Sequence, residues 1–131
     1  PRFFRSRVVP MPTPQIVADI SELEVPPRVS GSAWRLTPPE RDLDANIITL
    51  PADDEIRAHN GPDLDVLIHV LSGSGTLETD ADTLDLAPGL IVWLPRRSTR
   101  RFIAGPDGLS YFSVHQRKPG LSIGSRPPLR T

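Results

Sequence analysis

Proline and glycine are spread so evenly along this chain that long helices are excluded. The 131 residues include 16 prolines and nine glycines, and no long window between them carries apolar residues at a helical period. Proline lacks the backbone N–H that a helix interior needs, and glycine there loses more chain entropy than other residues. The sequence therefore predicts a protein of short strands and turns, with little helix.

Eight short runs rich in β-branched and aromatic residues lie between the prolines and glycines, and we predict them as strands. They span residues 32–36, 45–50, 65–71, 75–79, 83–86, 90–94, 100–104 and 109–115. The turn sequence SGSG connects the third run to the fourth, DAD connects the fourth to the fifth, and GPDG connects the seventh to the eighth. Short strands at regular spacing are typical of sandwiches, jelly rolls and small barrels. We predict one all-β domain over residues 16–120, with an arm at 1–15 and a tail at 121–131.

Composition narrows the classes of partner. With 15 basic and 16 acidic residues the net charge is -1, which argues against nucleic acid as a partner. A cluster of four arginines at 96–101 has no aromatic residues interleaved to stack bases. The chain has no cysteine, which excludes disulfides and cysteine zinc sites. It shows no membrane-spanning run or signal-peptide core, so we expect a cytoplasmic protein with no membrane partner.

Part of the chain, residues 53–104, resembles the cupin superfamily, whose members are small jelly-roll barrels. The family's first signature segment contains a glycine, two histidines, a glutamate and a second glycine at fixed intervals. Aligned on Gly73, its first four positions fall on Asp53, His59, Gly61 and Val66. The resemblance implies an all-β jelly roll, also called a double-stranded β-helix barrel, with one of three metal positions kept in this segment.

The family's second signature segment is also recognisable in its scaffold positions. Gly89 and Pro95 match it with the correct gap. Its internal glycine, its histidine and its asparagine are replaced by Arg97, Arg100 and Ala104. The resemblance therefore implies the family's barrel with a degenerate metal motif.

The aligned metal positions read His59, Gly61, Val66 and Arg100. Glycine and valine offer no ligand atom, and a guanidinium is permanently charged and repels a cation. Cupin-type metal sites need three imidazoles and a carboxylate, ligands that suit iron, manganese, zinc or nickel. We therefore predict no metal at this location and no cofactor.

One alternative depends on the register of the strand at 65–71. A spacing shorter by one residue would turn Asp65 and His69 inward, where they and His59 could hold a divalent transition metal. In the other register Val66 and Ile68 point inward instead. That inward set is the commoner core pattern, and we favour it.

Arg100 takes a position that faces the barrel interior in the resembling fold, where a buried charge needs an anion. One candidate is a protein carboxylate, and five are in the strand and turn that we expect near the same mouth of the barrel: Asp53, Asp54, Glu55, Asp63 and Asp65. The other is the carboxylate or phosphate of a small molecule, which a guanidinium binds through two parallel hydrogen bonds. Both alternatives stay open at this point.

Four aromatic or titratable residues complete the candidate set. Trp34 and Trp93 lie on strands with apolar neighbours, which favours core packing over ligand stacking. Tyr111 and His115 share a strand face by period-2 spacing and form an acid/base candidate pair.

We predict a cupin-like barrel that binds a small anionic molecule without metal, and we assign no catalytic residue. The predicted ligand-binding residues are His59, Val66, Ile68, Trp93 and Arg100. The alternative function is a divergent metal-dependent dioxygenase, isomerase or decarboxylase that uses His59, Asp65 and His69. Exposed edge strands and the apolar outward face of residues 65–71 predict a homodimer.

Overall fold

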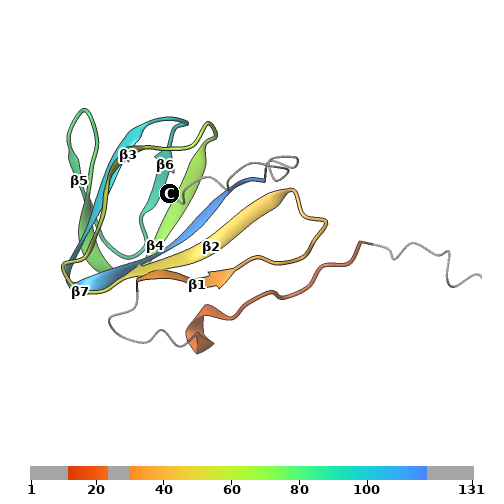
Figure 1. Cartoon of the computed structure of the whole chain (residues 1–131). Helices are drawn as coiled ribbons and strands as arrows, with labels where there is room; N and C mark the ends of the chain where they lie inside the picture. Colours follow the sequence, from red (N-terminus) through yellow and green to blue (C-terminus); the bar gives the residue numbers. More distant parts are fainter. Residues whose placement is uncertain (1–11, 24–29, 118–131) are drawn as a thin grey trace, which may run out of the picture.

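A computed structural model describes residues 12–23 and 30–117 (Figure 1). It contains a single turn of 3-10 helix, η2 (Ile20–Glu22), and seven strands: β1 (Gly31–Arg35), β2 (Leu43–Leu50), β3 (Glu55–Asn60), β4 (Val66–Glu78), β5 (Thr83–Leu86), β6 (Ile91–Leu94) and β7 (Thr99–Gln116). Most of the predicted arm and the whole predicted tail lie outside the described residues. Among the described residues, no helix has the length and apolarity to cross a membrane.

The strands form an antiparallel sheet that folds over on itself, which confirms the predicted all-β jelly roll. The two long strands β4 and β7 pair with each other and pass through both layers. One layer has the order β1-β2-β7-β4-β6, and the other has the order β3-β7-β4-β5. Figure 1 shows the layers enclosing the interior of the barrel.

Two predicted turns are instead corners inside long strands. SGSG was expected to be a hairpin and GPDG a turn, but β4 and β7 run through them with shifts of register. Gly73 and Gly108 both have positive φ, at 81° and 78°, and a side chain on Gly73 would overlap the Gly108 carbonyl oxygen. The glycines thus let both strands bend at the same point. The DAD hairpin is confirmed by a hydrogen bond from Thr79 N–H to the Asp82 carbonyl (2.9 Å).

The core confirms the favoured register of β4. Val66 and Ile68 are both 1% exposed, whereas Asp65 and His69 lie on the opposite, exposed face. Twelve buried residues form one cluster between the layers: Ile48, Leu50, Val66, Ile68, Val70, Leu77, Leu86, Leu94, Phe102, Ala104, Leu109 and Tyr111. Fully burying one large apolar side chain stabilises a fold by about 1.5–3 kcal/mol, so this cluster is its main support.

The predictions for the two tryptophans had different outcomes. Trp34 is half-buried, stacks against Phe112 with ring centroids 6.4 Å apart, and donates to the Val17 carbonyl (3.3 Å). Trp93 is 62% exposed, so the prediction of core packing was wrong. The reason is alternation: Val92 and Leu94 of β6 face inward and leave Trp93 on the outer face.

Strand β3 was missing from the predicted set. Its sequence, EIRAHN, has charged or polar residues at most positions, and only Ile56 and His59 are not fully exposed. It pairs with β7 alone and contains an irregularity between these two residues. An edge strand of this kind lacks the strict alternation that reveals a strand in sequence.

Candidate functional site

The interior of the barrel contains a buried arginine. Arg100 lies near the start of β7, directly opposite His59 of β3, and is 0% exposed. Its Nη2 donates to the Pro95 carbonyl (3.1 Å) and the Ser98 hydroxyl (2.9 Å), and its Nε donates to the Ser98 carbonyl (3.3 Å). Nη1 is buried with no partner. Desolvation lowers the pKa of Arg100, but an arginine remains charged at neutral pH.

No carboxylate of the described residues pairs with this guanidinium, so the first of the two alternatives, a salt bridge to a protein carboxylate, does not form. Other arginines bind three of the five candidate carboxylates. Arg101 bridges Glu55 and Glu78 (2.9 and 3.0 Å). In the same way Asp63 is paired with Arg97 (2.9 Å).

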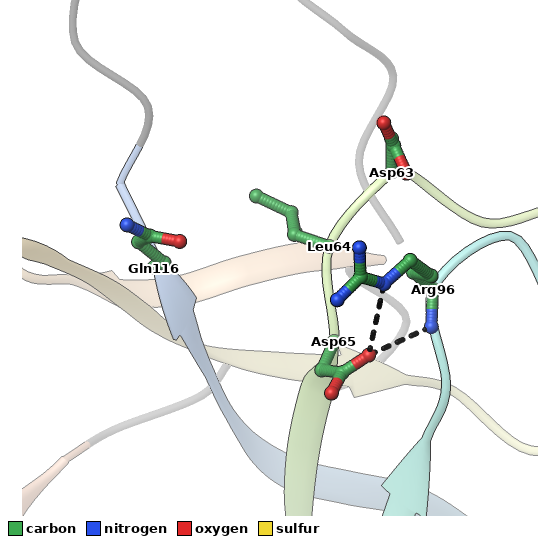
Figure 2. A pocket seen from close by; sticks show the side chains of 5 residues that line it. All are labelled: Asp63, Leu64, Asp65, Arg96 and Gln116. Carbon is green, nitrogen blue, oxygen red and sulfur yellow. Dashed lines mark hydrogen bonds and ion pairs between the residues drawn. The ribbon is translucent and has the colours of Figure 1, made fainter.

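Asp65 is paired outside the barrel as well. Its carboxylate accepts from the backbone N–H of Arg96 (3.0 Å) and lies 3.8 Å from the Arg96 side chain (Figure 2). Both side chains are more than half exposed and border a surface hollow of about 430 Å³, together with Asp63, Leu64 and Gln116. This hollow does not include Arg100.

Gly61 provides the space for the Arg100 guanidinium. A Cβ atom at Gly61 would overlap Nη2 and Cζ of Arg100. The backbone N–H of Gly61 also donates to the Ser98 carbonyl (2.9 Å), which accepts from Arg100 too. The resembling family has histidines at the positions of Gly61 and Arg100. In this chain Gly61 has no side chain, and the guanidinium of Arg100 occupies the space that a side chain there would need.

Three further buried polar atoms have no partner in the described part of the chain: His59 Nε2, the Tyr111 hydroxyl and the Ser113 hydroxyl. His59 Nδ1 lies 2.8 Å from the Arg57 carbonyl, which can only accept, so Nδ1 carries a proton and, in this tautomer of the imidazole, Nε2 is an acceptor. Burial raises the pKa of Tyr111, and the nearby charge of Arg100 offsets part of this rise. The phenol is therefore a protonated donor. Since buried polar groups almost always have partners, each of these atoms, like Arg100 Nη1, calls for water or a ligand as its partner.

A cavity of about 280 Å³ reaches Arg100 from the side of the barrel where β5 and β6 lie. Its walls come from the β4–β5 hairpin, β6 and the loop before β7: Leu77, Thr79, Asp80, Ala81, Leu84, Val92, Trp93, Leu94, Pro95, Ser98, Thr99 and Arg100. Two predicted ligand-binding residues, Arg100 and Trp93, border it. Val66 and Ile68 lie in the core instead, and His59 neighbours Arg100 across the strand pair.

The structure does not assemble the alternative metal set of His59, Asp65 and His69. Asp65 and His69 point away from the interior, because the alternation of side chains along the strand places them on the face opposite to that of Val66. Residues 12–23 and 30–117 contain no group of three or more histidine, aspartate or glutamate side chains that could hold a metal ion.

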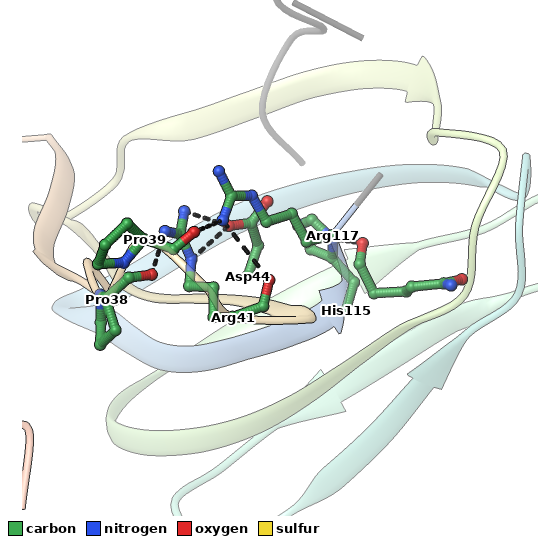
Figure 3. Close-up of polar contacts among 7 residues, drawn as sticks. Pro38, Pro39, Arg41, Asp44, His115 and Arg117 are labelled. Carbon is green, nitrogen blue, oxygen red and sulfur yellow. Dashed lines mark hydrogen bonds and ion pairs between the residues drawn. The ribbon is translucent and has the colours of Figure 1, made fainter. Parts of the chain in front are cut away.

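The other acid/base candidate, His115, lies in a polar region at the end of β7 (Figure 3). Its Nδ1 contacts the Gln116 carbonyl (2.9 Å), and its strand neighbour Asp44 is paired with Arg41 (2.8 Å). Arg117 in the same region donates to the Pro39 carbonyl (2.9 Å). These contacts do not include the buried Tyr111.

Comparisons with known proteins find likeness in structure alone. No family model matches the chain, and no curated protein matches its sequence. A cupin superfamily protein from Desulfitobacterium hafniense DCB-2 is 15% identical, with a TM-score of 0.64 over 82% of this chain and 95% of that one. A conserved protein of unknown function from Streptococcus pyogenes is 19% identical, with a TM-score of 0.63 over 84% and 93%.

Two further solved structures align over a smaller share of each chain. The cupin domain of Schizosaccharomyces pombe Cnp3 is 16% identical, with a TM-score of 0.58 over 65% of this chain. The polyketide cyclase RemF from Streptomyces resistomycificus is 20% identical, with a TM-score of 0.55 over 62%. The aligned part spans 59% of each of these two chains.

Proposed function

We propose that this chain, which has the cupin fold, binds a small anionic molecule inside its barrel through Arg100 and without a metal. One observation carries the proposal: the guanidinium is 0% exposed, has no carboxylate partner among the described residues and keeps one nitrogen unpaired. An unpaired buried charge costs several kcal/mol. A carboxylate or phosphate bound at Nη1 would offset that cost.

The unpaired atoms around Arg100 fit such a ligand. Nη1 and the Tyr111 hydroxyl are donors, and both suit the oxygens of an anion. His59 Nε2 is an acceptor and suits a hydroxyl group of the ligand or a bridging water. Because the three groups come from β3 and from both halves of β7, the folded barrel preorganises them.

Isothermal titration calorimetry with sodium salts of carboxylates and with inorganic phosphate tests the proposal. We expect at least one of these anions to bind wild type and to raise its melting temperature by mass action. Arg100→Gln should abolish binding, and Arg100→Lys, which keeps a point charge but loses the fork, should weaken it. Arg96→Gln is the matched control, because it removes one exposed positive charge from the neighbouring loop.

Two results would overturn the proposal. The first is that no anion binds the wild-type protein. The second is that Arg100→Gln, shown by circular dichroism to be folded, binds as tightly as wild type.

The absence of a metal is a separate part of the proposal. Gly61 and Val66 offer no ligand atom, and Arg100 would repel a cation. We expect elemental analysis of protein purified without chelators or added metals to give far less than one iron, manganese, zinc or nickel per chain. A stoichiometric metal that persists through dialysis would favour the metal-dependent enzyme instead.

A further inference from the structure

We infer that the bound anion is the carboxylate of a molecule with an apolar body, such as a short fatty acid or an aromatic acid, rather than a phosphate or sugar phosphate. This inference rests on the proposed function and narrows its ligand class. It comes from three properties of the cavity beside Arg100: its wall, its charge and its volume.

The wall offers apolar contacts and almost no free polar group. Six of the residues that line the cavity are apolar, namely Leu77, Ala81, Leu84, Val92, Leu94 and Pro95, and Trp93 borders it from the outer face of β6. The hydroxyls in the wall already have protein partners. Thr79 bonds to Asp82, Ser98 accepts from Arg100, and Thr99 donates to Asn60. A sugar would leave its hydroxyls without partners in such a wall, whereas a hydrocarbon chain or ring would fit it.

The charges favour a ligand with one negative charge at one end. Arg100 is the one cation among the described residues that line the cavity, which suits a ligand with a single negative charge. Asp80 borders the cavity from the exposed β4–β5 hairpin. Its carboxylate would repel a second negative charge on the ligand, and a phosphate monoester carries about −1.5 to −2 charges at neutral pH. A monocarboxylate with its head at Arg100 avoids that repulsion.

The volume limits the size of the ligand. About 280 Å³ equals the liquid volume of about nine water molecules. Hexanoate and benzoate are of this order of size, and both have the required apolar body. A long-chain fatty acid or a nucleotide would extend beyond this volume into solvent.

Calorimetry with a panel of probes tests the inference. We use hexanoate and benzoate, with acetate as a carboxylate without a body, hexanol as a body without charge, and phosphate and glucose 6-phosphate as rival anions. We expect hexanoate or benzoate to bind at least tenfold more tightly than any other member of the panel.

A wall variant with a matched control shows where the apolar body lies. Leu84→Thr removes apolar surface at the cavity and should weaken hexanoate binding about fivefold, from the loss of about one kcal/mol of apolar burial. Leu67→Thr makes the same change at a similarly exposed leucine on the outer face of β4 and should leave binding unchanged. Equal weakening by both variants would overturn the inference.

The panel separates failure of the inference from failure of the proposed function. Tighter binding of phosphate or glucose 6-phosphate, abolished by Arg100→Gln, would overturn the carboxylate and leave the anion site standing. Binding of none of the anions would overturn both. Equal binding of hexanol and hexanoate would overturn both as well, because Arg100 would then contribute nothing to recognition.

Discussion

Gly61→Ala tests whether the space at this glycine exists for the Arg100 guanidinium. Gly61 is outside the group of glycines with positive φ, so alanine is compatible with its backbone conformation. The added methyl group would overlap Nη2 and Cζ of Arg100, and Nε would be its next neighbour at 2.9 Å. The substitution therefore moves the guanidinium and strains its hydrogen bonds to Ser98 and Pro95.

The magnitude follows from two opposing effects. Overfilling a packed interior costs about 1–3 kcal/mol. Replacing glycine with alanine at a compatible site contributes about 0.4–1 kcal/mol of stability through the unfolded chain. We expect Gly61→Ala to lower the free energy of unfolding of the wild type by up to about 2.5 kcal/mol. In an Arg100→Val background the overlap is gone, so the same change should be neutral or stabilising.

Urea denaturation of the four proteins of this double-mutant cycle measures the coupling. We expect a coupling free energy of about 1–3 kcal/mol between the two positions, well above the error of about 0.5 kcal/mol. Gly105→Ala serves as the control, since its methyl group would meet the Ser74 hydroxyl and not Arg100. It should be additive with Arg100→Val. Additivity at Gly61 as well would refute the idea that these two residues share one space.

Three other predictions concern separate parts of the molecule. Tyr111→Phe should change the free energy of unfolding by less than about 1 kcal/mol, because the hydroxyl it removes has no partner. A larger loss of stability in chemical denaturation would show that this hydroxyl makes a hydrogen bond. Arg101 lowers the pKa of Glu55, so the stability from this pair is present above the ordinary pKa of 4.5 and is lost as pH falls through the lower folded value. The stability difference between wild type and Arg101→Met should therefore shrink below about pH 4.5, and a difference that stays constant in acid would contradict this. Finally, we propose that Leu67 and Trp93, exposed neighbours on β4 and β6, form a homodimer contact; light scattering should give the mass of two chains for wild type and of one for Trp93→Glu, and a monomeric wild type would contradict the contact.

The sequence predicted the barrel well because strand burial has a period of two. That period distinguished the Val66 register from the Asp65 register in β4, and applied to β6 it would also have placed Trp93 outside. The corners at Gly73 and Gly108 could not be predicted in this way. A glycine with positive φ serves a hairpin turn and a bent strand equally well, and only the partner strand decides which one forms.

Only part of the candidate site could be predicted from the sequence. Arg100 stood out because a charge replaced a family histidine, and its need for an anion followed from burial. Which anion Arg100 meets depends on the folded structure, in which Arg97 and Arg101 pair with Asp63 and Glu55, two of the candidate carboxylates. The role of Gly61 was also hidden, although its departure from the family pattern together with that of Arg100 was the available signal.

The position of β7 also determines when this chain can fold during synthesis. β7 pairs with β2, β3 and β4, and it lies inside both layers, yet it is the last strand of the described residues. A nascent chain that ends before Thr99 can form only the β1–β2 pair and the ladders of β4 with β5 and β6. These isolated hairpins are marginal in water. Residues 99–116 must therefore be synthesised before either layer closes, and until then the apolar faces of the earlier strands lack their partners.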